Sequence, residues 1–330
     1  MQDFCLTSLN YPLILPTQIF VKEKAILISP AFCVNIMQSG RAVETRSIRY
    51  VFIRGIYMSK PLLRLMTELS SRKWISRITG TFSKSSASRL LIPWFIKTYE
   101  IPAHEAELAP GDYPSLNAFF TRRLQTGARI IYEDPNMLLS PVDGKITAMS
   151  PITGGTLLNV KGHDYTLSDL LNHSPHLEKY KNGWAFVLYL SPKDYHRIHS
   201  PVSGKLVESE HIRGKVYPVN DFGLRHMKSV LSRNERRITY IKHEFGEIAV
   251  VKVGAMNVSS IQYTDDTATS WERGDELAYF EFGSTVVLLC EEGTFELNKD
   301  LSLGQNVKMG QPLGLLKPKK TRSGSTHPHT

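Results

Sequence analysis

One short internal repeat constrains the fold of this 330-residue chain more than any other feature. Ser-Pro-Val-Asp-Gly-Lys-Ile at 140–146 returns as Ser-Pro-Val-Ser-Gly-Lys-Leu at 200–206. A second pair follows, with Arg-Gly-Asp-Glu-Leu-Ala at 273–278 and Met-Gly-Gln-Pro-Leu-Gly at 309–314. Two interleaved copies of paired strands predict a compact, mainly antiparallel β core.

The two types of strand also resemble a known motif. Pro-Val-x-Gly-Lys strands paired with Gly-x-x-Leu-Gly strands are similar to the barrel-sandwich motif of lipoyl-carrier and related transport domains. Further strands are clearest at 184–190, 237–241 and 248–253. The expected fold class is α+β, with N-terminal amphipathic helices followed by a mainly antiparallel β core of interleaved barrel-sandwich-like repeats.

The positive charge of the chain is concentrated in one segment. Between 41 and 98 there are twelve Lys or Arg residues against Glu44 and Glu68, whereas the formal net charge of the whole chain is +9. Such a segment favours an anionic surface, which is either nucleic acid or anionic lipid. No nucleic-acid recognition motif accompanies it, so no nucleic-acid partner is expected.

The apolar residues of this segment favour lipid. They recur at helical spacing with basic residues between them, as in an amphipathic helix that lies in a membrane interface. The expected membrane-binding residues are apolar Phe52, Leu62, Leu65, Leu69 and Trp74, and basic Arg49, Arg54, Arg64, Arg72 and Lys73. The alternative is a surface helix that packs on its own domain. No apolar run is long enough to span a bilayer, so no spanning helix is expected.

The bond between Gly283 and Ser284 is the candidate reactive site. It lies between an acidic, strand-like run at 275–281 and an apolar run at 286–290. Glycine permits the strained backbone that an attack by Ser284 on its own peptide bond requires. A hydroxyl is a weak nucleophile, so a base must lie nearby. The alternative is an ordinary Gly-Ser turn between two hairpin strands.

Three other residues supply the parts of a proton relay. Asp143 stands where the second repeat has Ser203, so the turn itself does not require an acid. His196 and His199 lie just before the second repeat. In a nucleophile relay a carboxylate orients an imidazole, and the imidazole takes the hydroxyl proton.

These residues, in this order, resemble the phosphatidylserine decarboxylase family from about Arg46 to Leu316. The motifs that carry the resemblance are Ser-Pro-Val-Asp-Gly-Lys at 140–145, Tyr-His-Arg-Ile-His-Ser-Pro at 195–201, Val-Asn at 219–220, Asn-Glu-Arg at 234–236, Phe-Gly-Glu at 245–247, Val-Gly-Ala-Met-Asn-Val at 253–258 and Phe-Gly-Ser-Thr at 282–285. Phe282 replaces the usual Leu or Gly of the family, outside the bond that is cut.

The resemblance implies a proenzyme that cuts itself. Asp143 would orient His199, and His199 would deprotonate Ser284, which attacks the carbonyl of Gly283. The products would be a β chain that ends at Gly283 and an α chain that begins with a covalent pyruvoyl group derived from Ser284, the Schiff-base site for the substrate. His196 would transfer a proton during decarboxylation, although a structural, hydrogen-bonded histidine remains the alternative. No metal and no external cofactor are expected.

The resemblance also implies partners and a location. The substrate would be phosphatidylserine and the product phosphatidylethanolamine, so the protein would bind an anionic membrane surface peripherally, on the cytoplasmic face of the cell (inner) membrane. The α and β chains would stay together, and the sequence leaves a homodimer open. Cys5, Cys33 and Cys290 share no metal-ligand spacing and cannot all pair, which fits a reducing compartment.

Four regions are expected along the chain. They are a weakly ordered N-terminal extension at 1–40, a helical membrane-associating region at 41–136, a β-rich catalytic domain at 137–316 and a basic disordered tail at 317–330. In the second region, Pro93 suits the first turn of one short helix and Ser115 the cap of another. The broken apolar start lacks the pattern of a signal peptide.

Three other functions remain open. A serine hydrolase could use the same residues, but the Gly-x-Ser-x-Gly motif that usually exposes its nucleophile is missing from the sequence. A carrier or phosphotransfer module of the barrel-sandwich type could be phosphorylated on His196 or His199 and would leave the Gly283–Ser284 bond intact. A decarboxylase of a related serine phospholipid would share every motif.

Overall fold

The computed structural model describes most of the chain after residue 79. The described residues are 80–160, 163–217, 219, 229–255, 261–281 and 284–319, together with the backbone of 19–21 and 24–26. The contacts of the chain separate it into two units, 1–70 and 71–330. In the first unit, β1 (Ile19–Val21) and β2 (Lys24–Ile26) form an antiparallel pair. Most of the predicted extension and the predicted membrane-binding residues lie outside the described residues.

Short helices open the described part of the second unit. Pro93 lies in the first turn of α4, where a missing N–H costs nothing, and the Ser115 hydroxyl accepts a hydrogen bond of 3.2 Å from the amide of Ala118 at the start of α5. Both sequence predictions are therefore confirmed. The helices are η1 (Ser86–Leu91), α4 (Ile92–Tyr99), η2 (Ala103–Glu105), η3 (Pro110–Asp112) and α5 (Leu116–Phe120).

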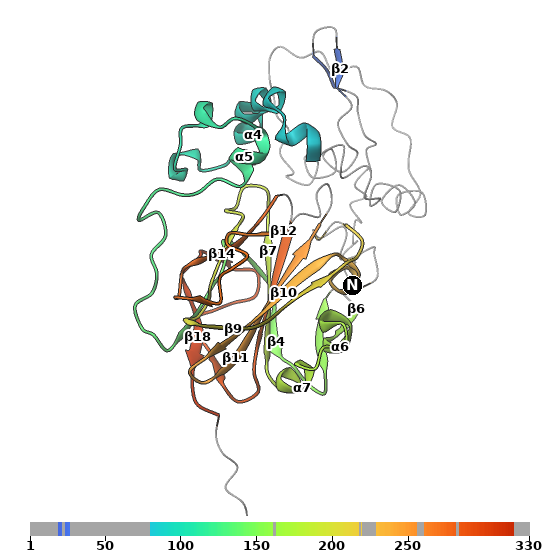
Figure 1. Ribbon diagram of the computed structural model, residues 1–330, viewed down its shortest axis with the longest axis vertical. Coiled ribbons are helices and arrows are strands. Elements are labelled where there is room, and N and C mark those ends of the chain that lie inside the picture. Colours follow the sequence, from blue (N-terminus) through green and yellow to red (C-terminus); the bar gives the residue numbers. More distant parts are fainter. Residues whose placement is uncertain are drawn as a thin grey trace, which may run out of the picture. The chain divides into compact units, whose positions relative to one another are not determined.

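An eight-stranded antiparallel sheet forms the centre of the second unit (Figure 1), in the order β13-β9-β10-β11-β15-β7-β4-β17. Its strands are β4 (Gly144–Pro151), β7 (Trp184–Leu190), β9 (Gly204–Ile212), β10 (Arg236–His243), β11 (Gly246–Gly254), β13 (Ser270–Trp271), β15 (Ser284–Cys290) and β17 (Asn306–Val307). The three strands predicted most clearly from the sequence are β7 and parts of β10 and β11. The predicted α+β class with a mainly antiparallel core is confirmed.

Two smaller antiparallel sheets accompany it, in the orders β12-β14-β8 and β16-β18-β3. Their strands are β3 (Met137–Leu139), β8 (Arg197–His199), β12 (Ile261–Tyr263), β14 (Glu276–Phe280), β16 (Phe295–Leu297) and β18 (Pro312–Leu316). The remaining elements are β5 (Thr156–Val160), β6 (His163–Thr166), α6 (Leu167–Leu171), α7 (Leu177–Tyr180) and α9 (Val230–Arg233). The described strands form open sheets rather than a closed barrel.

The two sequence repeats fold in the same way. The Ser140 hydroxyl donates to the carbonyl of Val142 at 2.7 Å, and the Ser200 hydroxyl donates to the carbonyl of Val202 at the same distance. The copies also bind each other reciprocally. The amide of Leu139 donates to the carbonyl of Pro201, and the amide of His199 donates to the carbonyl of Pro141, at 3.1 and 2.8 Å. These matched pairs indicate an approximate twofold relation between the copies.

The order of the strands extends this relation to the whole core. One copy is continuous and runs from β8 to β14, whereas the other begins with β3, β4 and β7 and resumes with β15 to β18. Equivalent strands of the two copies lie at equal distances from the centre of the large sheet, where β11 pairs with β15. Ser284 is the residue at which the divided copy resumes.

The core lies on both faces of the large sheet. Along β15, Val286, Leu288 and Cys290 pack with residues of the two smaller sheets, whereas Val287 and Leu289 pack with residues of α6 and α9. Because side chains alternate along a strand, Ser284 belongs to the face covered by the smaller sheets. The candidate nucleophile therefore lies inside the protein.

Candidate active site

Ser284 is the first residue of β15 and is fully buried. Its strand is hydrogen-bonded on both edges, so Ser284 lies opposite Gly254 of β11 and Leu190 of β7. The hydroxyl oxygen Oγ lies 3.4 Å from Nδ1 of His196. Phe282 and Gly283 lie outside the described residues. The structure thus brings one of the two predicted imidazoles to the predicted nucleophile.

His196 is fully buried and held from two sides. Its Nε2 lies 3.0 Å from the carbonyl oxygen of Ser191, and the ring of Phe120 lies against it with a centroid distance of 4.0 Å. Because a carbonyl only accepts, Nε2 carries the proton and Nδ1 is left as an acceptor toward Ser284. Burial, and next the charge of Arg122, lower the pKa of His196 to about 3, so the ring is neutral at neutral pH.

His199 ends β8 and has different partners. Its Nδ1 donates to the carbonyl of Gly274 at 2.7 Å, which leaves Nε2 to accept from the hydroxyl of Tyr195 at 3.0 Å. Burial lowers the pKa of His199 as well. This imidazole is therefore neutral and carries a lone pair, as a general base requires.

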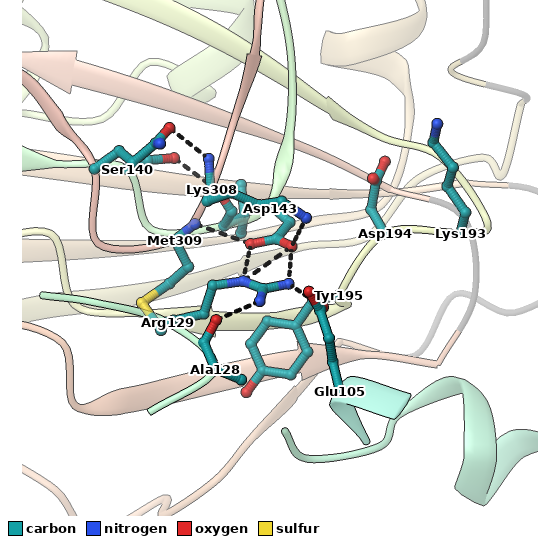
Figure 2. A network of polar contacts seen from close by, with 12 residues as sticks. Glu105, Ala128, Arg129, Ser140, Asp143, Lys193, Asp194, Tyr195, Lys308 and Met309 are labelled. Atoms are coloured by element: carbon teal, nitrogen blue, oxygen red, sulfur yellow. Dashed lines mark hydrogen bonds and ion pairs between the residues drawn. The ribbon is translucent and has the colours of Figure 1, made fainter. Parts of the chain in front are cut away.

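Asp143 lies in the turn before β4 and is 1% exposed. Its carboxylate accepts hydrogen bonds from Nε and Nη2 of Arg129 at 2.9 and 2.5 Å, from the amide of Met309 at 2.9 Å and from Nζ of Lys308 at 3.1 Å (Figure 2). Burial alone would raise the pKa of Asp143, but the hydrogen bonds and charge of Arg129 hold it below its ordinary value. The carboxylate stays ionised inside the protein.

The second repeat shows which hydrogen bonds the turn at Asp143 needs. Ser203, the counterpart of Asp143, accepts a hydrogen bond of 3.1 Å from the amide of Arg273, as Asp143 does from Met309. Either residue can therefore stabilise the turn. The turn itself therefore does not require the negative charge of Asp143, as the sequence comparison of the repeats predicts.

Arg129 connects this carboxylate to the helical part of the unit. Its Nη2 also donates to Oε2 of Glu105 in η2 at 2.8 Å. The side chains of Arg129 and Asp143 are 7% and 2% exposed, so the ion pair is buried. Sequence analysis missed Arg129, since a single arginine in a basic chain has no recognisable pattern.

Of the four predicted site residues, only Ser284 and His196 contact each other directly. Ser284 contacts His196, whereas the hydrogen bonds observed for His199 and Asp143 go to other described residues. Burial is the main cause of the low pKa of both imidazoles, and the charge of Asp143 is near enough to oppose it in each. The roles assigned to these four residues stay predictions.

The buried ion pair gives a prediction of its own. Arg129→Met should lower the free energy of unfolding by about 3–5 kcal/mol at neutral pH, because it leaves a buried carboxylate without its main partner. The pKa of Asp143 is lowered in the folded protein, so this stabilisation is present above its ordinary pKa of 3.8 and is lost as the pH falls through the folded value. The difference in the free energy of unfolding between Arg129→Met and wild type should therefore shrink as the pH falls through the folded-state pKa of Asp143.

Urea denaturation at several pH values would measure this difference in the free energy of unfolding. Both proteins would carry Ser284→Ala so that they stay uncleaved. Lys308→Met is the matched control, because Lys308 bonds the same carboxylate but its side chain is 49% exposed. It should cost no more than about 1 kcal/mol. A constant difference between Arg129→Met and wild type at every pH would refute the linkage to Asp143.

The described residues also bear on cofactors and membranes. No group of three or more His, Cys, Asp or Glu side chains there is arranged to hold a metal ion. Within the same part of the chain, every helix is too short or too polar to cross a bilayer.

Comparison with known proteins identifies the family. The fold is α+β, and Ser284 is buried at the start of a central strand of its largest sheet. A family model described as Phosphatidylserine decarboxylase matches residues 116–315. Three relatives named phosphatidylserine decarboxylase proenzyme extend the similarity. The protein of Anoxybacillus flavithermus is 41% identical over 263 residues, which are 80% of this chain and 99% of that protein.

The other two relatives agree closely. The Geobacillus sp. protein is 41% identical over 260 residues, 79% of this chain and 100% of its own length. The protein of Bacillus thuringiensis subsp. konkukian is 39% identical over 256 residues, 78% of this chain and 97% of its own length. The chain therefore belongs to the phosphatidylserine decarboxylase family, as the sequence motifs predict.

Proposed function

We propose that this protein decarboxylates phosphatidylserine to phosphatidylethanolamine by means of a pyruvoyl group that it makes from its own Ser284. The reaction follows from membership of the family. The formation of the pyruvoyl group from Ser284 is supported by the position of this residue. Ser284 is fully buried at the start of β15, and its Oγ lies 3.4 Å from an imidazole nitrogen.

The proposed self-cleavage begins with Ser284. Its hydroxyl attacks the carbonyl carbon of Gly283 and moves the acyl group from nitrogen to oxygen. Elimination of the resulting ester frees the carboxyl group of Gly283, and water then releases the nitrogen of residue 284 as ammonia, which leaves the pyruvoyl group. We assign the deprotonation of Ser284 to His199, with Asp143 stabilising the imidazolium that forms.

The surroundings of Ser284 suit such a group. Gly254 lies directly opposite and adds no side chain, and Leu190 on the other edge is apolar and buried. The pyruvoyl group would supply a ketone that binds the amine of the substrate and withdraws electrons as carbon dioxide leaves. The buried position keeps bulk water away from it.

His196 is the residue we assign to proton transfer during decarboxylation. Its Nδ1 faces residue 284, so it would remain beside the substrate once cleavage is complete. The anionic substrate would raise the pKa of this buried imidazole and allow it to hold the proton that it delivers. The contact between His196 and Ser284 also favours a second candidate, in which His196 is the base for cleavage.

The two product chains should remain one folded protein. Residues 284–330 would form the α chain, which contributes β15 to β18. The strand β15 is paired on one edge with β11 and on the other with β7, both of the β chain. Cleavage before Ser284 breaks none of these pairings.

The direct test is to incubate the purified protein with dihexanoylphosphatidylserine and measure carbon dioxide and phosphatidylethanolamine. We expect both products from wild type and neither from Ser284→Ala. An unchanged rate in the variant would refute the role of Ser284. Faster turnover of a different serine phospholipid would favour the related-substrate alternative.

We further propose that the basic segment at 45–78 holds the protein on the cytoplasmic face of the cell (inner) membrane. Apolar Phe52, Leu65 and Trp74 would enter the acyl boundary while neighbouring arginines contact head groups. At roughly 1 kcal/mol for each basic residue near an anionic surface, the charges would supply much of the binding energy.

Liposome binding should therefore rise with anionic lipid and fall in high salt, which screens the attraction. Replacing Phe52, Leu65 and Trp74 by Ser should weaken it further while leaving activity on a short-chain, soluble substrate intact. Leu303→Ser, at an exposed leucine of the β-rich domain, is the control and should have no effect. Binding that ignores both lipid charge and these substitutions would assign the anchor to residues 1–40.

A further inference from the structure

Arg122 is a buried cation with few partners. It follows α5 and is 2% exposed. Its Nε is buried and has no hydrogen-bond partner among the described residues. Its other nitrogens make only long contacts to backbone carbonyls, namely those of Phe119 at 3.5 Å, Lys193 at 3.3 Å and Asp194 at 3.5 Å. The guanidinium carbon also lies 5.2 Å from the centroid of the Phe119 ring, a cation–π contact that supplies no hydrogen-bond acceptor. Burial lowers the pKa of this guanidinium group, which marks the cost of leaving its charge uncompensated.

A second buried arginine shows what a structural role looks like. Arg236 is also 2% exposed, but its Nε and Nη2 donate to the carbonyls of Leu170 and Asp169 at 2.7 Å, and its Nη1 donates to two more carbonyls. The guanidinium group of Arg236 is satisfied on every nitrogen. The guanidinium group of Arg122 is not satisfied in this way, so packing alone does not account for the burial of Arg122.

The carboxylates that act on Arg122 are already paired with another side chain. Arg129 pairs with Asp143 and Glu105, whereas none of the described carboxylates lies within ion-pair distance of Arg122. Asp194 contacts Arg122 through its backbone carbonyl, but its carboxylate accepts hydrogen bonds from the amide and hydroxyl of Ser191, both at 2.7 Å. Arg122 therefore leaves one positive charge for an anion that the described residues do not supply.

This charge acts on the histidine that contacts Ser284. The ring of Phe120, two residues before Arg122, lies against His196, and the Nη2 of Arg122 contacts the backbone just before Tyr195. The charge of Arg122 is the second cause, after burial, of the low pKa of His196. His196 in turn contacts Ser284. Arg122 and Ser284 are thus both connected to His196, one through its charge and the other through a direct contact.

We infer that Arg122 binds the phosphodiester of the serine phospholipid head group, an assignment that rests on the function proposed above. The Nε and Nη2 edge of a guanidinium offers two parallel N–H donors, which match the two unesterified oxygens of a phosphodiester. The substrate carboxylate is the poorer fit, since it leaves as neutral carbon dioxide. A fixed cation there would stabilise the ground state more than the transition state.

The test compares two soluble substrates. Dihexanoylphosphatidylserine carries the phosphodiester, whereas O-methyl-L-serine keeps the amine and the carboxylate without it. In Arg122→Gln, kcat/KM for the phospholipid should fall about 10- to 100-fold more than kcat/KM for O-methyl-L-serine, the loss expected for a hydrogen-bonded charge. Most of this loss should appear as a higher KM for the phospholipid, and Arg122→Lys should recover part of the lost kcat/KM.

Arg123→Gln is the matched control, because it removes the same charge from the next residue, whose side chain is 53% exposed. It should affect both substrates equally. Inhibition of wild type gives a second measurement, in which glycerophosphoethanolamine should inhibit at about 10-fold lower concentration than ethanolamine, and Arg122→Lys should narrow this gap.

Equal losses on both substrates in Arg122→Gln would overturn the assignment. So would failure of self-cleavage in both Arg122→Gln and Arg122→Lys, since Arg122 would then belong to the folding framework. Absence of activity in wild type would instead refute the proposed function, so the two failures can be told apart.

Discussion

Ser284→Ala is expected to yield a single chain of full length without decarboxylase activity. Alanine has no hydroxyl to attack the preceding carbonyl, and no other residue can become the pyruvoyl group. Because Ser284 is fully buried and its backbone is paired on both sides, the smaller side chain should leave the fold intact. A denaturing gel should show the chains 1–283 and 284–330 for wild type and one band for the variant.

The neighbouring residue offers a close control. The hydroxyl of Thr285 is also buried and has no hydrogen-bond partner among the described residues. Thr285→Val keeps the shape of the side chain and should still be cleaved. Cleavage of Ser284→Ala at the same bond would show that another group makes the attack.

The second large effect separates the two histidines. His199→Ala should slow self-cleavage by about 10²–10⁴, the usual contribution of a general base. His196→Ala should be cleaved substantially and then decarboxylate poorly. Asp143→Asn should behave like His199→Ala, because it removes the charge that stabilises the imidazolium. A time course of cleavage on gels, followed by assay of the processed chains, measures both steps.

The observed contacts make this comparison decisive. His196 already touches Ser284, whereas Nε2 of His199 is held by Tyr195 and would have to exchange that partner before it could act. If His196→Ala abolishes cleavage and His199→Ala does not, His196 is the base. The contact seen in the structure would then be the reactive one.

The core could be predicted where the sequence repeats itself. The matched hydrogen bonds of Ser140 and Ser200 are local and follow directly from the repeated Ser-Pro-Val. The pairing of strands far apart in the chain could not be predicted in the same way. That β7 pairs with β15, across the whole of the second copy, depends on packing between distant segments and leaves no local pattern.

The candidate site was predictable to a similar extent. Ser284 and His196 belong to short motifs, and the structure brings them into contact. Arg129 and Arg122, which act on Asp143 and His196, were missed, since neither belongs to a recognisable motif and only their burial distinguishes them. A buried guanidinium bonds a carboxylate through two parallel donors, which explains why Asp143 is bound to Arg129 rather than to an imidazole.

The mass of the short chain from purified wild-type protein tests the central proposal most directly. The account predicts a chain of residues 284–330 whose mass is lower by one ammonia than that of the same peptide with an intact serine, and whose N-terminus resists sequential degradation. An uncut chain of 330 residues, or a fragment that begins with an ordinary serine amine, would contradict it.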